Sequence, residues 1–300
     1  MTRATQLMRP LATRYCGRFA PSPSGPLHFG SLIAAVGSYL DAKAIDGEWL
    51  VRIEDIDPPR QVTGADTQIL NALEAFGLHW DQSVLYQSTH QQDFLDRIHQ
   101  LVADQHAYAC DCTRKRVKSI GGHYDGHCRD RHLPIEGHAV RFKHHHRVDH
   151  FHDLRLGSIE LHPPWNQEDF IIKRRDGLIA YQLAVVMDDL SQGVNHVVRG
   201  IDLLETTGWQ IALYQNFEQQ PPAYLHLPLA LDEHGNKLSK QNHAAPINWQ
   251  HPQPELCQAL ACLNLHVPQQ LRHSTVSDIL DWAKTHWNRE KLGVKRSVNL

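Results

Sequence analysis

The sequence has no long apolar run. No window approaches the roughly 18 consecutive apolar residues of a membrane-spanning helix, and the first twenty residues carry basic side chains without the apolar stretch of a secretory signal. These absences argue against a membrane-embedded or exported protein. We therefore expect a cytoplasmic protein with no membrane partner, and because nothing in the sequence implies a protein partner, we expect a monomer.

The chain also lacks an excess of basic charge and a disulfide framework. Its formal net charge at pH 7 is −3, so an RNA partner would have to meet a local basic patch. Only six cysteines are present, and without a secretory signal their clustering favours reduced thiols, some of them metal ligands. The histidine run at 144–146 is interpreted as a solvated loop rather than a metal site.

Strand and helix patterns alternate in the first part of the chain, which predicts an α/β fold. Residues 15–20 predict a strand, and residues 31–47 predict a helix with Ser31 as its N-cap and Gly47 as its stop. Residues 48–57 predict a second strand, and another amphipathic helix follows. Repeats of about 30 residues of this kind are typical of a parallel α/β sheet.

The remaining sequence suggests an interrupted domain with an appendage. We expect residues 1–109 to form the first half of the α/β domain, with 1–14 as a mobile leader. Residues 110–165 lose hydrophobic periodicity and collect His, Cys, Arg and Pro, which indicates an insertion. The α/β pattern resumes over 166–245, where residues 223–231 predict a strand. Residues 246–300 carry short helical patterns and a frayed basic tail.

A long connection joins the first strand to the first helix. It reads "GRFAPSPSGPLHFGS", residues 17–31, and is crowded with proline and glycine. A helix N-terminus after a strand is a place where backbone N–H groups receive phosphate. Gly25 and Gly30 allow close approach of the main chain, and His28 lies two residues before the second of them. The connection matches neither the P-loop nor the dinucleotide-binding glycine pattern.

A second candidate phosphate-binding element lies near the end of the α/β region. The turn "KLSKQ", residues 237–241, places two lysines three positions apart beside a serine. Such lysines can neutralise the charge that develops on ATP phosphates. The order of the two elements, separated by an α/β domain, is more specific than either alone.

These stretches resemble the signatures of class I aminoacyl-tRNA synthetases. The segment "RFAPSPSGPLHFGS" resembles the HIGH signature in the form used by glutamyl- and glutaminyl-tRNA synthetases, and "KLSKQ" resembles KMSKS. The stretches "VRIEDIDPPR" and "YQLAVVMDD", and the later "VNHVVRGIDLLETTGWQ", also resemble the glutamyl branch, so the likeness covers residues 17–245. Ser31 stands where many class I enzymes have histidine, which implies weaker phosphate contacts there without loss of activity.

The resemblance implies a fold and a reaction. The fold is a Rossmann-like parallel sheet with an inserted, zinc-containing, acceptor-type subdomain and a small helical C-terminal region. Because the chain stops at Leu300 without a large anticodon-binding region, it resembles the short family of this branch that attaches glutamate to queuosine in the anticodon of tRNA(Asp). The implied activity is ATP-dependent, tRNA-independent activation of L-glutamate, followed by transfer to that tRNA.

Two alternatives stay open at this point. The first is a short glutamyl-tRNA synthetase that charges the 3′ end of tRNA(Glu), which the missing anticodon region disfavours. The second is a catalytically silent paralogue that binds glutamate or RNA. The presence of Arg18, Glu54, Arg199 and Lys240 disfavours this second alternative.

The residue types fit a dicarboxylic amino acid. Arg18 and Arg199 can each bind a carboxylate in a bidentate fork, and Glu54 can pair with the ammonium group. Tyr181 and Ser22 offer hydroxyl groups nearby, and the resemblance adds Ala20 to the glutamate-binding set. For ATP, which we expect to bind with Mg²⁺, the resemblance implies Pro21, His28, Gly30, Ser31, Lys237, Ser239 and Lys240. His28 and Lys240 are the expected catalytic residues.

The cysteines of the insertion have the spacing of a metal site. Cys110 and Cys112 form a C-x-C pair, and Cys128 follows after fifteen residues, which is typical of a structural tetrahedral zinc site. From chemistry alone the fourth ligand would be His123 or His127, whereas the resemblance implies Tyr124. We expect one structural Zn²⁺ per chain. The other cysteines, Cys16, Cys257 and Cys262, are expected to be core thiols.

Overall fold

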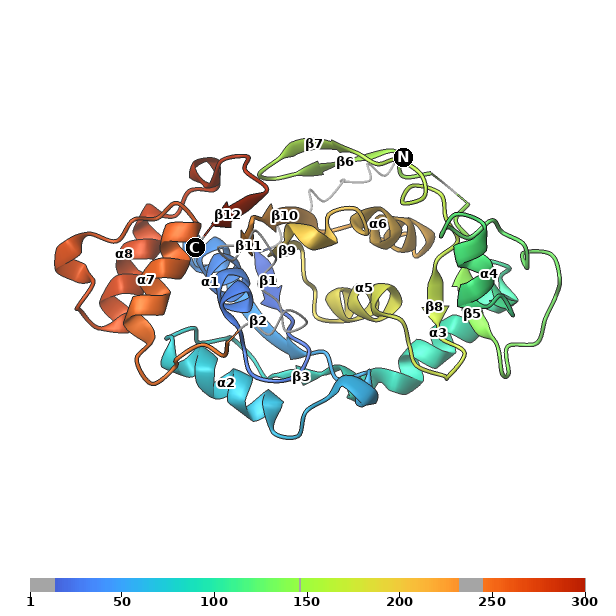
Figure 1. Cartoon of the computed structure of the whole chain (residues 1–300), viewed down its shortest axis with the longest axis horizontal. Helices are drawn as coiled ribbons and strands as arrows, with labels where there is room; N and C mark the ends of the chain where they lie inside the picture. Colours follow the sequence, from blue (N-terminus) through green and yellow to red (C-terminus); the bar gives the residue numbers. More distant parts are fainter. Residues whose placement is uncertain (1–13, 146, 232–244, 300) are drawn as a thin grey trace, which may run out of the picture.

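The computed structural model describes residues 14–145, 147–231 and 245–299. Figure 1 shows an elongated molecule with the helices α7 (Pro252–Cys262) and α8 (Val276–His286) at one end, and α4 (Arg114–Ser119) with β5 (Ala139–Phe142) at the other. In these ranges no helix combines the length and hydrophobicity that a bilayer crossing requires.

Parallel strands form the centre of the molecule. On one side β1 (Cys16–Phe19) pairs with β2 (Glu48–Ile53), which pairs with β3 (Leu85–Tyr86). On the other side β9 (His196–Gly200) pairs with β10 (Ala223–Leu227). Strands β1 and β9 lie beside each other. The chain order therefore runs outward in both directions from this junction, where ligands bind in open α/β sheets.

A hairpin extends the second half of the sheet. Its strands are β6 (His150–Asp153) and β7 (Gly157–Glu160), which pair antiparallel with each other. Strand β6 also pairs in parallel with β10. Residues from the segment expected to be an insertion therefore reach the central sheet.

Helices cover the sheet and build its core. The main ones are α1 (Phe29–Lys43), α2 (Ala65–Ala75), α3 (Gln91–Ala103), α5 (Tyr181–Ser191) and α6 (Thr207–Asn216). Short 3-10 turns are η1 (Pro58–Arg60), η2 (Gln87–His90), η3 (Ile201–Leu203), η5 (Gln269–Leu271) and η6 (Arg289–Leu292). One core cluster packs α1, α2, α7 and α8 together, and another packs α3, α5 and α6.

The first helix begins earlier and ends earlier than the sequence pattern predicts. It starts at Phe29, and the N-cap is His28, whose Nδ1 accepts a hydrogen bond from the backbone N–H of Ser31. The predicted Ser31 cap is wrong, because His28 precedes the helix and its ring accepts from one of the free N–H groups of the first turn. The helix ends at Lys43, ahead of the predicted stop at Gly47.

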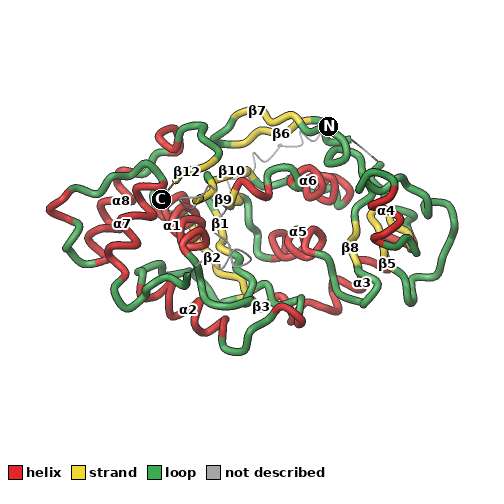
Figure 2. Tube along the Cα trace, viewed as in Figure 1, coloured by secondary structure: helices red, strands yellow, loops and turns green. Residues whose placement is uncertain are grey.

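A small antiparallel sheet carries the cysteine-rich segment. Its strands are β4 (Ala107–Cys110), β5 and β8 (Ile171–Lys173). Most of the chain between α4 and β5 is loop, as Figure 2 shows. His144 follows β5 and is buried, with its ring edge-on to Phe170. The prediction of a solvated loop is therefore wrong for this histidine.

The C-terminal segment is tied to the sheet. The sequence predicted one strand over 223–231, but it divides into β10 and β11 (Leu229–Leu231) at Pro228. Strand β12 (Ser297–Asn299) pairs in parallel with β11, so the prediction of a frayed tail is wrong.

A buried carboxylate joins the C-terminal segment to α1. Asp41 is 2% exposed and accepts hydrogen bonds from the hydroxyl of Tyr15 at 2.6 Å and from the indole N–H of Trp287 at 3.0 Å. Arg289 donates to both of its oxygens, at 2.7 and 3.0 Å. This single side chain therefore holds three segments of the chain together.

Asp41→Asn should destabilise the protein. The substitution removes the charge that pairs with Arg289 inside the structure, and such a loss costs about 2–3 kcal/mol in free energy of unfolding when one partner is partly exposed. Urea unfolding measures the difference. The control is Asp281→Asn, because Asp281 is an exposed partner of Lys284 and should cost less than about 1 kcal/mol. Equal losses in the two variants would contradict this role of Asp41.

Candidate active site

A cavity of about 260 Å³ lies at the carboxyl ends of the first strands. The loop after β1, the segment after β2 and the start of α5 line it. Three of the residues predicted to bind glutamate are in its wall: Ser22, Glu54 and Tyr181. Arg174, which precedes α5 along the chain, also lines it.

Arg18 lies near the end of β1 and is held by an acidic residue of α5. Its side chain is 4% exposed, and its Nε and Nη2 donate to the two carboxylate oxygens of Asp189 at 3.0 and 3.4 Å. Arg52, fully buried on β2, places its Nη2 2.8 Å from the same carboxylate. Burial alone would raise the pKa of Asp189, but the two guanidinium groups lower it.

The pairing leaves part of Arg18 available for a ligand. A guanidinium carries five N–H donors, and Asp189 takes two of them from one edge. The end formed by Nη1 and Nη2 can still bind a carboxylate in a fork. Asp189 therefore fixes the orientation of Arg18 without blocking it.

Glu54 follows β2 and lacks a full set of partners. Its side chain is 8% exposed, and its Oε1 lies 3.6 Å from Nη2 of Arg52 without a hydrogen bond. Burial raises the pKa of Glu54 to about 7, against the opposing effect of Arg52 and Arg18. A buried carboxylate with an unsatisfied oxygen is suited to receive a cationic group.

Arg199 lies near the end of β9 and is held only by uncharged acceptors. It is 5% exposed, and its Nε donates to His226 at 3.1 Å. Its Nη1 donates to the amide oxygen of Gln210 and its Nη2 to the hydroxyl of Thr207, both at 2.8 Å. Within the described ranges it forms no ion pair with a carboxylate. Three of its five donors are used, and one N–H is left on each terminal nitrogen, which together make a carboxylate fork.

Tyr181 connects these charged groups. It is the first residue of α5, and burial, together with the charge of Glu54, raises the pKa of its hydroxyl, against the opposing effect of Arg199 and Arg18. All three charges are thus close enough to act on this ring. Of the other predicted residues, Ala20 directly follows β1, and the carbonyl of Pro21 accepts a hydrogen bond from the backbone N–H of Glu54 at 3.0 Å.

Three of the predicted nucleotide-binding residues, His28, Gly30 and Ser31, lie at the start of α1. Nε2 of His28 lies 3.0 Å from the hydroxyl of Ser31, and Gly30 stands between them in the first turn. Lys237, Ser239 and Lys240 lie outside the described residues.

The chain that follows the predicted lysine turn returns to the same place. Pro246 forms an antiparallel bridge with His28, and the backbone N–H of Ile247 donates to the carbonyl of Leu27 at 3.0 Å. Residues 246 and 247 are therefore anchored against the residues that cap α1.

The residues that form hydrogen bonds with the two arginines were not predicted from the sequence. Asp189 follows another aspartate inside an apolar helix, and Gln210 is fully buried in α6. His226 lies in the middle of a buried strand and is 0% exposed. A polar residue inside an apolar run needs a buried partner, and this was the one signal available in the sequence.

The three cysteines of the insertion converge. The sulfur atoms of Cys110, Cys112 and Cys128 all lie within 4.8 Å of one another, and those of Cys112 and Cys128 are 3.5 Å apart. Thiolates bound at about 2.3 Å to one tetrahedral zinc lie roughly 3.8 Å apart. The cluster can therefore hold a metal ion of this kind.

The surroundings favour Tyr124 as the fourth donor. It is 6% exposed, its hydroxyl accepts a hydrogen bond from the backbone N–H of Cys128 at 2.7 Å, and it also interacts with the thiol of Cys110. The two histidines that flank it in sequence, His123 and His127, are exposed. Neither belongs to the group of metal-ligating atoms found among the described residues.

A cation supports the thiolate form of the first cysteine. Nε of Arg141 donates to the sulfur of Cys110 at 3.4 Å, and its guanidinium stacks 3.6 Å from the centre of the Tyr124 ring. Burial opposes ionisation of Cys110, but the backbone N–H of Cys112 and Arg141 outweigh it and lower the pKa.

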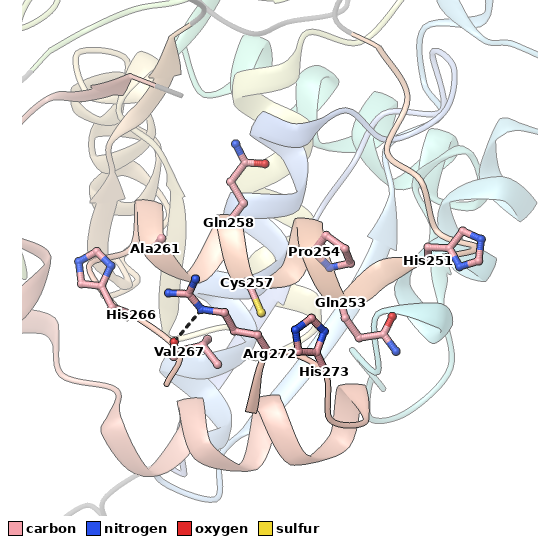
Figure 3. Close-up of a pocket in the computed structure, with 10 residues that line it drawn as sticks. All are labelled: His251, Gln253, Pro254, Cys257, Gln258, Ala261, His266, Val267, Arg272 and His273. Atoms are coloured by element: carbon pink, nitrogen blue, oxygen red, sulfur yellow. Dashed lines mark hydrogen bonds between the residues drawn. The ribbon is translucent and has the colours of Figure 1, made fainter. Parts of the chain in front are cut away.

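A larger cavity, of about 670 Å³, lies away from these groups. Figure 3 shows that one face of α7 and the segment after it form its wall, with Cys257, Arg272 and His273 among the lining residues. It contains none of the residues predicted to bind substrate or metal, so volume alone does not mark the active site.

Comparison with known proteins agrees with this geometry. A family model described as tRNA synthetases class I (E and Q), catalytic domain, matches residues 16–265. The glutamyl-Q tRNA(Asp) synthetase of Yersinia pseudotuberculosis is 54% identical over 286 residues, which cover 95% of this chain and 86% of that protein. The protein of the same name from Vibrio parahaemolyticus is 54% identical over 279 residues, 93% of this chain and 94% of its own length.

A solved structure shows the same fold. The glutamate-tRNA synthetase from Elizabethkingia anophelis has a TM-score of 0.78 at 23% identity, covering 96% of this chain and 68% of that chain. The predicted class I synthetase fold is therefore confirmed. The chain belongs to the class I tRNA synthetases of the glutamyl and glutaminyl branch and, within it, to the glutamyl-Q tRNA(Asp) synthetases, which are ligases.

Proposed function

We propose that this protein activates L-glutamate with ATP, independently of tRNA, and transfers it to queuosine in the anticodon of tRNA(Asp). The observation that carries the glutamate assignment is the presence of two buried charged groups whose charges the protein does not fully compensate. Arg199 is a buried guanidinium held by neutral acceptors, and Glu54 is a buried carboxylate with an unsatisfied oxygen. An amino acid completes both, with a carboxylate for the first and an ammonium group for the second. Glutamate brings a second carboxylate, which the open fork of Arg18 can bind.

The first step is an in-line displacement. A carboxylate oxygen of glutamate attacks the α-phosphorus of ATP, the bond to the bridging oxygen breaks, and glutamyl-adenylate and pyrophosphate are formed. No protein nucleophile is needed, so the protein contributes alignment and charge stabilisation. Arg18, Arg199 and Tyr181 would orient the amino acid.

The nucleotide would bind at the start of α1. The free N–H groups there favour phosphate, and His28 with Ser31 would contact it directly. The turn with Lys237, Ser239 and Lys240 would stabilise the leaving pyrophosphate, and Mg²⁺ would accompany ATP. The bridge of Pro246 to His28 supports this proposal, because it holds the chain five residues after that turn beside the cap.

The second step would transfer the glutamyl group to RNA. A hydroxyl of the cyclopentene ring of queuosine attacks the carbonyl of the adenylate, and AMP leaves. The relatives in Yersinia and Vibrio that share 54% of their aligned residues with this chain carry the name of this reaction. That identity supports the queuosine acceptor over the 3′ end of tRNA(Glu).

Internal contacts support activation without tRNA. Asp189 holds Arg18, and His226 with Gln210 holds Arg199. Because these side chains are ordered within the chain, no RNA is required to assemble the glutamate site. Preorganised groups of this kind give the greatest electrostatic stabilisation.

The function is tested with labelled glutamate, ATP and tRNA(Asp) from which the 3′-terminal adenosine has been removed. We expect pyrophosphate exchange with glutamate in the absence of any tRNA. We expect label to be transferred to the truncated tRNA only when it contains queuosine. Exchange that needs tRNA, or transfer that needs the 3′ adenosine of tRNA(Glu), would favour a short glutamyl-tRNA synthetase, and no exchange at all would indicate a silent paralogue.

Glutamate binding should depend on the protonation of Glu54. Since the pKa of this buried carboxyl is raised to about 7, the neutral form prevails below that pH and must lose a proton before it can pair with the ammonium. The KM for glutamate in pyrophosphate exchange should rise about tenfold per pH unit below 7. Glu54→Gln should give a high KM without this slope. A wild-type KM that stays constant from about pH 5.5 to 8 would contradict the role of Glu54.

We further propose that the cysteine cluster binds one structural Zn²⁺ through Cys110, Cys112, Tyr124 and Cys128. The segment between α4 and β5 has little regular structure, and a closed four-ligand site can supply the folding free energy that apolar burial does not. Arg175 donates to the carbonyl of Asp111 at 2.6 Å, within the C-x-C pair, and its neighbour Arg174 lines the glutamate cavity. This contact links the metal segment to the active site.

Cys112→Ser should lose the metal. Metal analysis of protein purified without chelators should find one zinc per wild-type chain and much less in the variant. Glutamyl transfer to tRNA should fall further than pyrophosphate exchange. Cys262→Ser, a thiol outside the cluster, serves as the control and should keep zinc. Zinc lost from His123→Ala or His127→Ala but retained by Tyr124→Phe would overturn the assignment of the fourth ligand.

A further inference from the structure

The hydrogen bond from Arg199 determines the tautomer of the buried His226. Nε of Arg199 is a donor only, so Nε2 of His226 must accept the hydrogen bond of 3.1 Å between them. A neutral imidazole with a free Nε2 carries its proton on Nδ1. Nδ1 of His226 lies 2.7 Å from an oxygen of Asp153, which can only accept. The three side chains therefore form one directed chain of hydrogen bonds, from Arg199 to His226 and from His226 to Asp153.

The environment keeps His226 in this neutral form. Burial, together with the nearby positive charges of Arg199 and Arg155, lowers its pKa to about 4 despite the opposing effect of Asp153. A protonated ring would point an N–H group at the N–H of Arg199. Burial raises the pKa of Asp153, but His226 and the backbone N–H groups of Leu156 and Arg155 together lower it below its ordinary value, so the carboxylate is ionised.

Asp153 is itself fixed by the backbone of the hairpin. One carboxylate oxygen accepts hydrogen bonds from the N–H groups of Arg155 and Leu156 at 3.0 and 2.9 Å. The other accepts from the backbone N–H and from Nδ1 of His226, at 3.0 and 2.7 Å. The carboxylate therefore has little freedom to move, and neither it nor His226 is accessible to solvent.

We propose that Asp153 and His226 are positioning residues that hold Arg199 with its terminal N–H pair directed at a carboxylate of the bound amino acid. The inference rests on the proposed glutamate activation and adds two residues to it, neither of which lines the cavity. The negative charge of Asp153 is linked to Arg199 through the ring of His226. This charge stabilises the buried guanidinium and leaves its terminal N–H pair open, whereas a direct ion pair would occupy that pair.

Thr207 and Gln210 alone leave the guanidinium incompletely fixed. Gln210 accepts from Nη1 and Thr207 accepts from Nη2. With these two bonds alone, the guanidinium plane can still tilt about the line between the two terminal nitrogens. The bond from Nε to His226 removes this motion. Loss of that acceptor should therefore affect glutamate affinity more than protein stability.

Two substitutions of His226 distinguish a role in orienting Arg199 from a role in stabilising the fold. In His226→Asn the amide occupies the place of Nδ1 and can pair with Asp153, but Nε of Arg199 loses its acceptor. In His226→Gln the longer side chain puts an amide oxygen at the place of Nε2, where it can accept from Arg199. The KM values for glutamate and for ATP are measured for both variants in pyrophosphate exchange, together with thermal melting.

His226→Asn should raise the KM for glutamate roughly 10- to 100-fold, the effect of losing a hydrogen bond to a charged group, and leave the KM for ATP within about twofold. His226→Gln should restore most of the glutamate affinity. A glutamate KM unchanged in His226→Asn, or raised equally in both variants, would overturn the proposal. Absence of exchange in the wild-type protein would instead refute the proposed function.

A measurement on the wild-type protein does not depend on variant folding. Long-range proton–nitrogen correlation spectra report which ring nitrogen carries the proton, and the His226 signals are assigned by their absence in His226→Gln. We expect Nδ1 protonated and Nε2 unprotonated at pH 7. A proton on Nε2 would overturn the proposal, because that nitrogen could not then accept from Arg199.

Discussion

The charge of Arg199 is the constraint on which the candidate site depends. A guanidinium with 5% exposure costs several kcal/mol unless its charge and its donors are compensated. Here neutral acceptors take three donors, and the carboxylate of Asp153 is linked to Arg199 through His226. The charge of Arg199 therefore has no direct ion-pair partner among the described residues. In the proposed function, a carboxylate of the substrate supplies that partner.

The other arginines of the site show the opposite arrangement. Arg18 and Arg52 share the carboxylate of Asp189, and Arg52 also lies near Glu54. In this cluster the attraction between the guanidinium groups and the carboxylates fixes the positions of the side chains. At Glu54 burial outweighs the opposing effect of Arg52 and Arg18, which is why its pKa rises. In the proposed function, the ammonium group of the substrate would compensate this carboxylate.

Much of the fold was predictable from the sequence, because its alternating strands and helices follow local patterns. Strand 15–20 and the helix after it were found within a few residues, whereas the helix start was missed because a histidine took the cap. The strand predicted over 223–231 is interrupted by Pro228. The tail after Arg289 forms a strand through pairing with β11, a contact between distant segments that no local pattern contains.

The candidate site was predictable to a smaller extent. Glu54 and Tyr181 line one cavity, and the charges of Arg18 and Arg199 act on the hydroxyl of Tyr181. The binding of glutamate by these residues stays a prediction. The positioning residues could not be found in the same way. His226 lies 73 residues from Asp153 and 27 from Arg199, and only the folded sheet brings them together. The choice between Tyr124 and its neighbouring histidines likewise depends on burial, which the spacing of the cysteines does not reveal.

A crystal structure with bound glutamate and a non-hydrolysable ATP analogue tests the role of Arg199 most directly. We expect one substrate carboxylate within hydrogen-bond distance of Nη1 and Nη2 of Arg199, and the ammonium beside Glu54. We also expect the bonds from Arg199 to His226 and from His226 to Asp153 to stay in place. Glutamate bound elsewhere, or bound with Arg199 turned away from His226, would contradict this role.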